Sequence, residues 1–417
     1  MAFPVQAQGR VSSTIPGKVR ASLILAIVVV PIVLTASPAR AQTYTVLHSF
    51  TGPTTDGGQP IAIIRDADGT LYGTACIGGE SYGGAAFTLS PNGKETMLYS
   101  FLAGYGSCPD SLVPWKGEFY GATASGGAYY AGAIFKLDKK GNEVVLHSFH
   151  GSRDASHPVL SLSDGNGVFY GTDYFGGVYG YGMVFKVDAA GKETTLHSFG
   201  TGADGSRPTP GLVPDEAGNL YGATSGLDLN CGSSCGTVFK LDSTGKLTTL
   251  HEFTGGADGT SPSTGLIRDS SGNLYGVTGY GGNLNCIPPY GCGTVFMLDP
   301  SGRETVLYRF SGSPDGSVPG GNLVRDESGN LFGVTSYGGD ASCWPPYGCG
   351  TVFKLDTSGK ETVLHRFHYS PDGADPVQLI RDASGNLYGT TYSGGEVLCR
   401  PRAGGAIGCG TVFKLTP

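Results

Sequence analysis

Short apolar runs, separated by polar turns, follow one another along almost the whole chain. Four runs make one unit, and the last unit shows them at residues 376–382, 386–391, 411–415 and, from the other end of the chain, 45–50. The breaks carry Asp at the start of a turn and Gly near its end, which is typical of β-hairpins. Because helical periodicity is absent from residues 42–417, the pattern predicts an all-β fold.

The unit occurs seven times, with an aromatic residue followed by Gly once in each copy: Tyr72, Tyr120, Tyr170, Tyr221, Tyr275, Phe332 and Tyr388. The spacings of 48, 50, 51, 54, 57 and 56 residues are typical of propellers and similar repeat arrays. Residues 44–50 and 410–415 are two fragments that together complete one unit. We therefore predict a seven-bladed β-propeller with four antiparallel strands per blade, whose last blade is closed by the N-terminal strand. A right-handed β-solenoid is the alternative.

Three aromatic positions recur in every unit: the L-Y-G aromatic, the V-F-K phenylalanine and the H-S-F phenylalanine. A residue that recurs at one strand phase in all units is most simply packing, so we expect these rings to fill the contacts between neighbouring blades. We expect the glycine beside each L-Y-G aromatic to make room for the next sheet.

Residues 1–41 stand outside the repeat. Basic residues lead into an apolar run at 21–36, and Ala39-Arg40-Ala41 forms a small-x-small cleavage site, which predicts a secretory signal peptide. An uncleaved membrane anchor is the alternative, although the run is short and contains Pro31. Cleavage would leave residues 42–417 as the propeller domain, with 23 basic and 34 acidic residues and a net charge of −11. Such a surface argues against nucleic acid and anionic membranes as partners.

All ten cysteines lie after residue 41, and eight form close pairs at one phase of the repeat: Cys231/Cys235, Cys286/Cys292, Cys343/Cys349 and Cys399/Cys409. In an exported protein these pairs predict disulfides that close loops. Zinc binding is weaker, because the spacings vary and the loops contain no histidine. Cys76 and Cys108 fall on loops of adjacent blades at the same face, so we predict a disulfide between them.

The pattern G-N-L-Y-G-T-T, G-T-V-F-K-L-D and E-T-V-L-H-S-F resembles the repeat of the choice-of-anchor tandem repeat GloVer-containing bacterial proteins over residues 43–417. That resemblance implies an exported protein but no established activity. Many members bear a C-terminal anchor, whereas this chain stops at Leu415-Thr416-Pro417, so it resembles an unanchored member. The second unit departs from the pattern, with Trp115-Lys116-Gly117-Glu118 in place of the usual turn.

Histidine recurs in the L-H-S-F slot at His48, His147, His197, His251 and His365, with Tyr99 and Tyr308 in the other units. Because a catalytic base is needed once, we interpret this series as structural. The off-pattern histidines, His150, His157 and His368, have no partner that the sequence identifies. The recurring Asp-Gly pairs are interpreted as turns, since one carboxylate per loop is too few for calcium. No nucleophile, metal or cofactor motif is present, so we expect no metal and no cofactor.

Asymmetry among the units gives the functional hypothesis. Units five and six carry near-twin loops, Cys286-Ile-Pro-Pro-Tyr-Gly-Cys292 and Cys343-Trp-Pro-Pro-Tyr-Gly-Cys349. Aromatic residues on rigid loops suit stacking on sugars or gripping a protein, so we expect ligand contact at Tyr290, Trp344 and Tyr347, with Tyr280 and Tyr337 as further contacts.

The resulting hypothesis is an exported, monomeric and non-enzymatic binding or scaffold propeller that recognises a glycan or an extracellular protein. Its location would be periplasmic, extracellular or at the cell surface, without a membrane span after cleavage. The alternative is an exported hydrolase or lyase acting on polysaccharide, with a carboxylate pair at the central channel.

Overall fold

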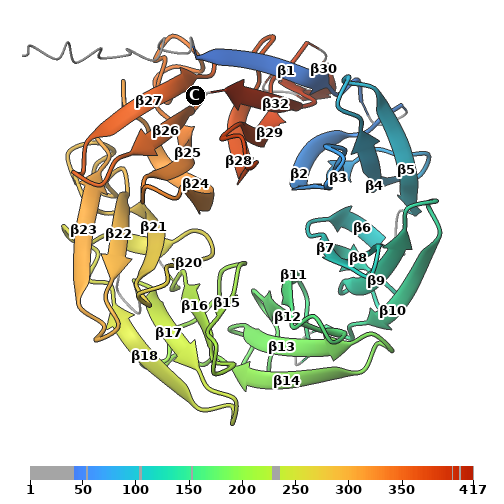
Figure 1. Cartoon of the computed structure of the whole chain (residues 1–417), viewed down its shortest axis with the longest axis horizontal. Coiled ribbons are helices and arrows are strands. Elements are labelled where there is room, and N and C mark those ends of the chain that lie inside the picture. Colours follow the sequence, from blue (N-terminus) through green and yellow to red (C-terminus); the bar gives the residue numbers. More distant parts are fainter. Residues whose placement is uncertain are drawn as a thin grey trace, which may run out of the picture. The chain divides into compact units, whose positions relative to one another are not determined.

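The computed structural model describes residues 42–52, 55–102, 106–151, 154–227, 235–396, 398–402 and 405–416. The predicted signal peptide, residues 1–41, lies outside the described residues. The repeat domain forms seven antiparallel sheets, which Figure 1 shows arranged as the blades of a ring. The predicted seven-bladed β-propeller is confirmed, and no solenoid is formed.

Each blade begins with a strand next to the ring axis. These first strands are β2 (Gly58–Arg65), β6 (Gly106–Pro109) with β7 (Val113–Trp115), β11 (Pro158–Ser163), β15 (Val213–Pro214), β19 (Thr260–Pro262) with β20 (Ile267–Arg268), β24 (Ser317–Arg325) and β28 (Ala374–Arg381). The second strands are β3 (Leu71–Ile77), β8 (Glu118–Gly126), β12 (Val168–Asp173), β16 (Leu220–Thr224), β21 (Leu274–Tyr280), β25 (Leu331–Tyr337) and β29 (Leu387–Ser393).

The third strands are β4 (Tyr82–Leu89), β9 (Ala133–Asp138), β13 (Met183–Asp188), β17 (Thr237–Leu241), β22 (Thr294–Leu298), β26 (Thr351–Leu355) and β32 (Thr411–Thr416). The outermost strands are β5 (Glu95–Leu102), β10 (Glu143–Ser148), β14 (Glu193–Ser198), β18 (Leu247–Glu252), β23 (Glu304–Arg309), β27 (Glu361–Arg366) and β1 (Thr43–Ser49). A small hairpin of β30 (Leu398–Arg402) and β31 (Gly405–Gly408) is inserted in the seventh blade.

The two ends of the repeat domain meet in one sheet. Strand β1 pairs antiparallel with β32, with Tyr44 opposite Leu415 and Ser49 opposite Thr411, and completes the order β1-β32-β29-β28. This pairing confirms the predicted closure of the last blade by the N-terminal strand (Figure 1).

Aromatic rings fill the contacts between neighbouring blades, as predicted. The H-S-F phenylalanine of each blade packs against the V-F-K phenylalanine of the next, with ring centroids 4.9–5.5 Å apart. The contact between Phe50 and Phe87 joins the seventh blade to the first. These contacts recur at every boundary, so a pair of packed phenylalanines joins each blade to the next.

The glycine of each L-Y-G motif faces a phenylalanine of its own blade and not, as predicted, the next sheet. A Cβ placed on Gly73 would meet the ring of Phe87 at 2.3 Å, and Gly73 and Phe87 are paired within one blade. The same clash recurs at Gly389 with Phe413. The expectation that this glycine makes room for the next sheet is therefore wrong, because the space belongs to the phenylalanine of its own blade.

A different glycine governs the approach of neighbouring blades. The glycine before each third strand faces the proline at the start of the next blade, and an added Cβ would meet that proline Cδ at 2.2–2.7 Å. The pairs are Gly84–Pro109, Gly132–Pro158, Gly182–Pro208, Gly236–Pro262, Gly293–Pro319, Gly350–Pro376 and Gly410–Pro60. The described residues contain no helix that could span a membrane.

Candidate functional site

The loops that join second and third strands lie at the same end of the blades as the connections to the next blade, because successive strands alternate in direction. We call this end of the ring the loop face. The disulfides Cys286–Cys292 and Cys343–Cys349 close the twin loops on this face, each with Cα atoms 5.6 Å apart. Each disulfide therefore joins the two ends of its loop covalently.

A cavity of about 410 Å³ opens on the loop face between the fifth and sixth blades. We call it the aromatic pocket, and it is lined by Tyr280, Ile287, Tyr290, Val318, Tyr337, Trp344 and Tyr347. All five residues expected to contact a ligand lie in this one lining. The structure thus brings together side chains from β21, β25 and both twin loops.

The rings in the pocket are set at angles to one another. Tyr280 and Tyr290 have centroids 6.1 Å apart, and Tyr337 and Tyr347 repeat this arrangement at 6.0 Å one blade later. Trp344 and Tyr347 are 51% and 56% exposed, so both present ring surface to solvent. The pocket therefore offers several aromatic faces to one ligand.

The polar atoms of the pocket are phenolic hydroxyls rather than charged groups. None of the seven lining side chains is charged at neutral pH. Burial, followed by the nearby Asp375 carboxylate, raises the pKa of the Tyr337 hydroxyl above its usual value. This hydroxyl therefore stays protonated at neutral pH and can donate or accept a hydrogen bond.

Backbone hydrogen bonds fix the twin loops against the strands. The N–H of Gly281 donates to the Tyr290 carbonyl, and the N–H of Gly338 donates to the Tyr347 carbonyl, both at 2.7 Å. Trp344 has φ +57°, and its carbonyl accepts a hydrogen bond from the Tyr347 N–H at 3.0 Å. A non-glycine residue in this left-handed region persists only where its surroundings hold it, so the tryptophan is preorganised.

Two features of the site were missed from the sequence. Val318 lines the pocket from the start of β24, the first strand of the sixth blade, and Ile287 completes the lining. Exposed aromatic side chains also stand in or beside the corresponding loops of the first three blades: Tyr82, Tyr129, Tyr130, Phe175 and Tyr179. The doublet Tyr129-Tyr130 and the sequence Val-Tyr-Gly-Tyr at 178–181 were available signals.

The remaining cysteine predictions have mixed outcomes. Cys76 and Cys108 form a disulfide with Cα atoms 3.8 Å apart, which confirms the predicted link between the first two blades. Cys399 pairs with Cys409, also as predicted. Cys231 lies outside the described residues, so its pairing with Cys235 stays a prediction.

Three of the recurring histidines, His48, His197 and His365, contact the aspartates of the Asp-Gly turns at hydrogen-bond distance. Nε2 of His251 lies farther from Asp258, at 4.0 Å, and Nε2 of His147 has no hydrogen-bond partner among the described residues. Nε2 of His48 lies 2.8 Å from Asp56 Oδ2, and Nε2 of His197 lies 3.1 Å from Asp204 Oδ2. In the fifth blade Tyr308 takes the histidine position and its hydroxyl donates to Asp315 at 2.7 Å. Because five different blades use the His or Tyr to Asp pairing, it fixes the connection between blades.

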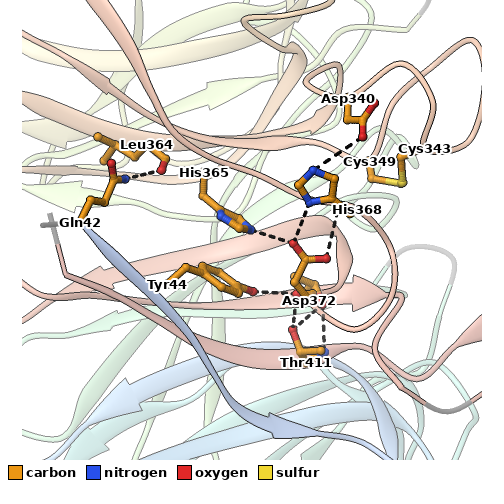
Figure 2. Close-up of polar contacts among 11 residues, drawn as sticks. Gln42, Tyr44, Asp340, Cys343, Cys349, Leu364, His365, His368, Asp372 and Thr411 are labelled. Atoms are coloured by element: carbon orange, nitrogen blue, oxygen red, sulfur yellow. Dashed lines mark hydrogen bonds and ion pairs between the residues drawn. A yellow bond between two sulfur atoms is a disulfide. The ribbon is translucent and has the colours of Figure 1, made fainter.

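Figure 2 shows the most elaborate of these pairs, at the junction with β1. Asp372 Oδ2 lies 2.9 Å from His365 Nε2 and 3.3 Å from His368 Nδ1, and His368 Nε2 lies 3.6 Å from Asp340 Oδ2. The Tyr44 hydroxyl donates to the Asp372 carbonyl at 2.7 Å. His368 thus has two carboxylate partners that the sequence did not reveal. Within the described residues, no three His, Cys, Asp or Glu side chains form a metal site.

A second cavity of about 270 Å³ lies on the ring axis, with lining residues from all seven blades. Among its described lining residues, Asp110 is the one carboxylate. Burial raises the pKa of the Asp110 carboxyl well above its usual value. Glycoside hydrolysis generally needs two carboxyl groups, so this lining offers half of the expected pair.

Comparisons with known proteins identify the repeat and the fold. A family model described as the Gloeobacter/Verrucomicrobia repeat matches residues 33–235, 110–345 and 289–417. No curated protein matches the chain.

Among solved structures, virginiamycin B lyase from Staphylococcus aureus is 13% identical, with a TM-score of 0.59, and the match covers 90% of this chain and 100% of that one. A streptogramin B lyase structure is 14% identical, with a TM-score of 0.58, over 90% of this chain and 97% of that one. An extracellular domain assigned to a hybrid two component system of B. thetaiotaomicron is 14% identical, with a TM-score of 0.56, over 90% of this chain and 42% of that one. At these identities the likeness shows the propeller fold alone.

Proposed function

Because this chain belongs to the Gloeobacter/Verrucomicrobia repeat family and folds as a seven-bladed propeller, we propose that it is an exported binding protein that holds a carbohydrate in the aromatic pocket. The observation that carries this proposal is the lining itself: four tyrosines and one tryptophan around a cavity of about 410 Å³. The proposed role is recognition rather than catalysis.

The chemistry of the pocket suits a neutral sugar. The C–H face of a pyranose ring is apolar and packs against an aromatic face, whereas its hydroxyl groups exchange hydrogen bonds with phenolic hydroxyls. The side chains of the lining are uncharged, so the pocket offers no cationic partner to a buried carboxylate on a ligand.

Preorganisation supports a binding role. The disulfide and the backbone hydrogen bonds hold each twin loop in one conformation before a ligand arrives. A loop that is already ordered loses little conformational entropy on binding, so more of the contact energy appears as affinity.

Disulfides support the proposed location outside the cytoplasm. Four disulfide bonds occur among the described residues. Such bonds form and persist in oxidising compartments and are rare in the cytosol. Export is also what the resemblance of the repeat implies.

The competing proposal is a polysaccharide-acting enzyme centred on the axial cavity. Asp110 is the observation that favours it, since a buried carboxyl with a raised pKa is suited to act as a general acid. The Asp110→Asn variant separates the two proposals. It should abolish any release of reducing ends from polysaccharide, and it should leave sugar binding in the aromatic pocket unchanged.

The direct test is a calorimetric titration of the purified protein with cellohexaose, xylohexaose and mannohexaose. These flat, neutral chains should bind, and a Trp344→Ala, Tyr347→Ala double variant should lose most of the affinity. The matched control is Tyr129→Ala, Tyr130→Ala, which removes two aromatic residues that are 54% and 71% exposed on another blade. Equal binding by wild type and the Trp344, Tyr347 variant, at equal stability, would place the site elsewhere.

A further inference from the structure

One position on the loop face combines a fixed backbone with a variable side chain. Every blade has a proline in or just before its first strand. The residue before that proline differs in all seven blades: Gln59, Cys108, His157, Arg207, Ser261, Val318 and Asp375. We call these residues the pre-proline ring. Their neighbours in the repeat are far more uniform, so this position varies where packing positions do not.

The backbone conformation at this position costs free energy for any residue with a side chain. Six of the seven have φ between 54° and 58°; they are Gln59, Cys108, Arg207, Ser261, Val318 and Asp375. That left-handed conformation is uncommon outside glycine and unusual for a β-branched residue such as Val318. The following proline also favours an extended conformation here. Glycine would adopt this geometry without steric penalty, yet none of the seven residues is glycine.

Blade packing explains the backbone but leaves the side chains unexplained. The N–H of Val318 donates to the Cys292 carbonyl of the preceding blade at 3.0 Å, and Ser261 donates to the Cys235 carbonyl at 2.8 Å. Gln59, Arg207 and Asp375 make the same bond to Cys409, Tyr181 and Cys349. Glycine has the same N–H, so it could make this contact equally well.

The side chains of the ring lie beside the aromatic residues of the loop face. Val318 lines the aromatic pocket. The Arg207 guanidinium lies 5.5 Å from the Tyr174 ring centroid and 6.0 Å from that of Phe175. Asp375 is close enough to influence the Tyr337 hydroxyl. Two members also have structural contacts: Cys108 forms the disulfide with Cys76, and Arg207 Nη1 donates to the Leu227 carbonyl at 3.1 Å. Asp375 likewise accepts a hydrogen bond from Ser336.

We propose that the pre-proline ring determines the specificity of the loop face and that Val318 selects a neutral sugar unit in the aromatic pocket. This inference rests on the proposed function and deepens it. At the crevice between the fifth and sixth blades, the chain retains the strained Val318 side chain because that side chain contacts the ligand. In the aromatic pocket, the isopropyl group of Val318 packs against the apolar face of the sugar. A carboxylate substituent at that point would lose its water without gaining a cationic partner.

The test compares Val318→Gly with Ser261→Gly, which changes the same backbone position in the fifth blade outside the pocket lining. Both substitutions relieve the left-handed strain, so both should leave Tm unchanged or about 1–2 °C higher. Affinity for cellohexaose should fall about tenfold in Val318→Gly and stay unchanged in Ser261→Gly.

Two results would overturn the ring proposal. The first is a clear fall in Tm for Val318→Gly, which would mean that the side chain is retained for stability. The second is undiminished cellohexaose affinity in Val318→Gly. Failure of the wild-type protein to bind cellohexaose would instead remove the proposed function and, with it, the ligand assigned to Val318. The Tm comparison needs no ligand, so the two failures can be told apart.

Discussion

His365 Nε2 lies 2.9 Å from Asp372 Oδ2, and this pair joins the outermost strand of the sixth blade to the turn that enters the seventh (Figure 2). The Tyr44 ring stacks on His365 with centroids 3.7 Å apart, so the N-terminal strand rests on the same pair. Burial alone would raise the pKa of the Asp372 carboxyl, but hydrogen bonds from His365 and His368 outweigh it and hold the pKa below its usual value.

Removing the histidine from such a pair should destabilise the ring. We expect His365→Ala to lower the free energy of unfolding by about 2 kcal/mol, because it removes one of the two histidine partners of the buried Asp372 carboxylate and the ring on which Tyr44 stacks. The control is His150→Ala, since the His150 side chain is 62% exposed and lies 3.3 Å from Asp154. Chemical denaturation gives the free energy of unfolding of both variants. Equal losses would show that the recurring pair stabilises the fold no more than an exposed pair does.

Two half-buried glutamates should make the protein less stable as pH rises towards neutrality. Burial, followed by nearby aspartates, raises the pKa of both Glu304 and Glu361 to about 7. The folded state therefore holds these protons between about pH 4.5 and 7 while the unfolded chain releases them, and stability falls across that window. Asp56 acts in the opposite sense: despite burial, hydrogen bonds led by that of His48 lower its pKa to about 2, so its contribution disappears as pH falls from about 4 to 2.

The Glu304→Gln, Glu361→Gln double variant tests this account. It should gain on the order of 1 kcal/mol per site at pH 8, after allowance for partial exposure, and little at pH 4.5. Thermal unfolding at both pH values provides the measurement, with the exposed Glu80→Gln as the control. A gain of the same size at both pH values would rule out protonation as its cause.

The contact between glycine and proline at the blade boundaries predicts a large difference between two chemically identical substitutions. Gly293 has φ +90°, and an added Cβ would lie 2.3 Å from the Thr278 carbonyl oxygen and 2.5 Å from Pro319 Cδ. Gly218 has φ +80° and nothing within 4 Å. Gly218→Ala should therefore cost about 1 kcal/mol from backbone strain alone, whereas Gly293→Ala should cost about 3 kcal/mol or more. Similar losses in urea denaturation would contradict the proposed blade contact.

The N-terminal strand should be essential to the closed ring. Deletion of residues 42–49 would expose the edge of β32 along its whole length, and an unpaired edge strand is a template for aggregation. We expect light scattering to show aggregation and calorimetry to show a clear fall in Tm. Tyr44→Phe is the milder companion, since it removes only the hydrogen bond to the Asp372 carbonyl. A monomeric deletion variant with an unchanged Tm would show that the strand does not close the ring.

The fold was predictable because the information for it is local. The turn residues around Asp382 and Gly385 mark the strands, and the complementary fragments at 44–50 and 410–415 imply closure. Tyr290, Trp344 and Tyr347 were found because their loops depart from the repeat. Val318 was missed because its role depends on a left-handed backbone and on the Cys292 carbonyl of the preceding blade, and neither is visible in a residue type.

Two recurring glycines show the same limit of prediction from sequence. The repeat marks Gly73 and Gly84 as equally invariant, but Gly73 makes room for Phe87 in its own blade and Gly84 for Pro109 in the next. Periodicity identifies that a position is constrained, whereas the neighbour that constrains it is visible only in the three-dimensional structure. Histidine partners such as Asp340 for His368 were hidden for the same reason.

Ligand binding in the aromatic pocket can be tested most directly with the protein's own fluorescence. The chain has two tryptophans, and only Trp344 lies in the pocket, so a Trp115→Phe variant leaves a single reporter at the proposed site. Titration with cellohexaose should change the emission of Trp344 saturably, with the same dissociation constant that calorimetry gives for the wild type, and Tyr347→Ala should weaken both signals. Calorimetric binding of cellohexaose without any change in Trp344 emission would contradict the account.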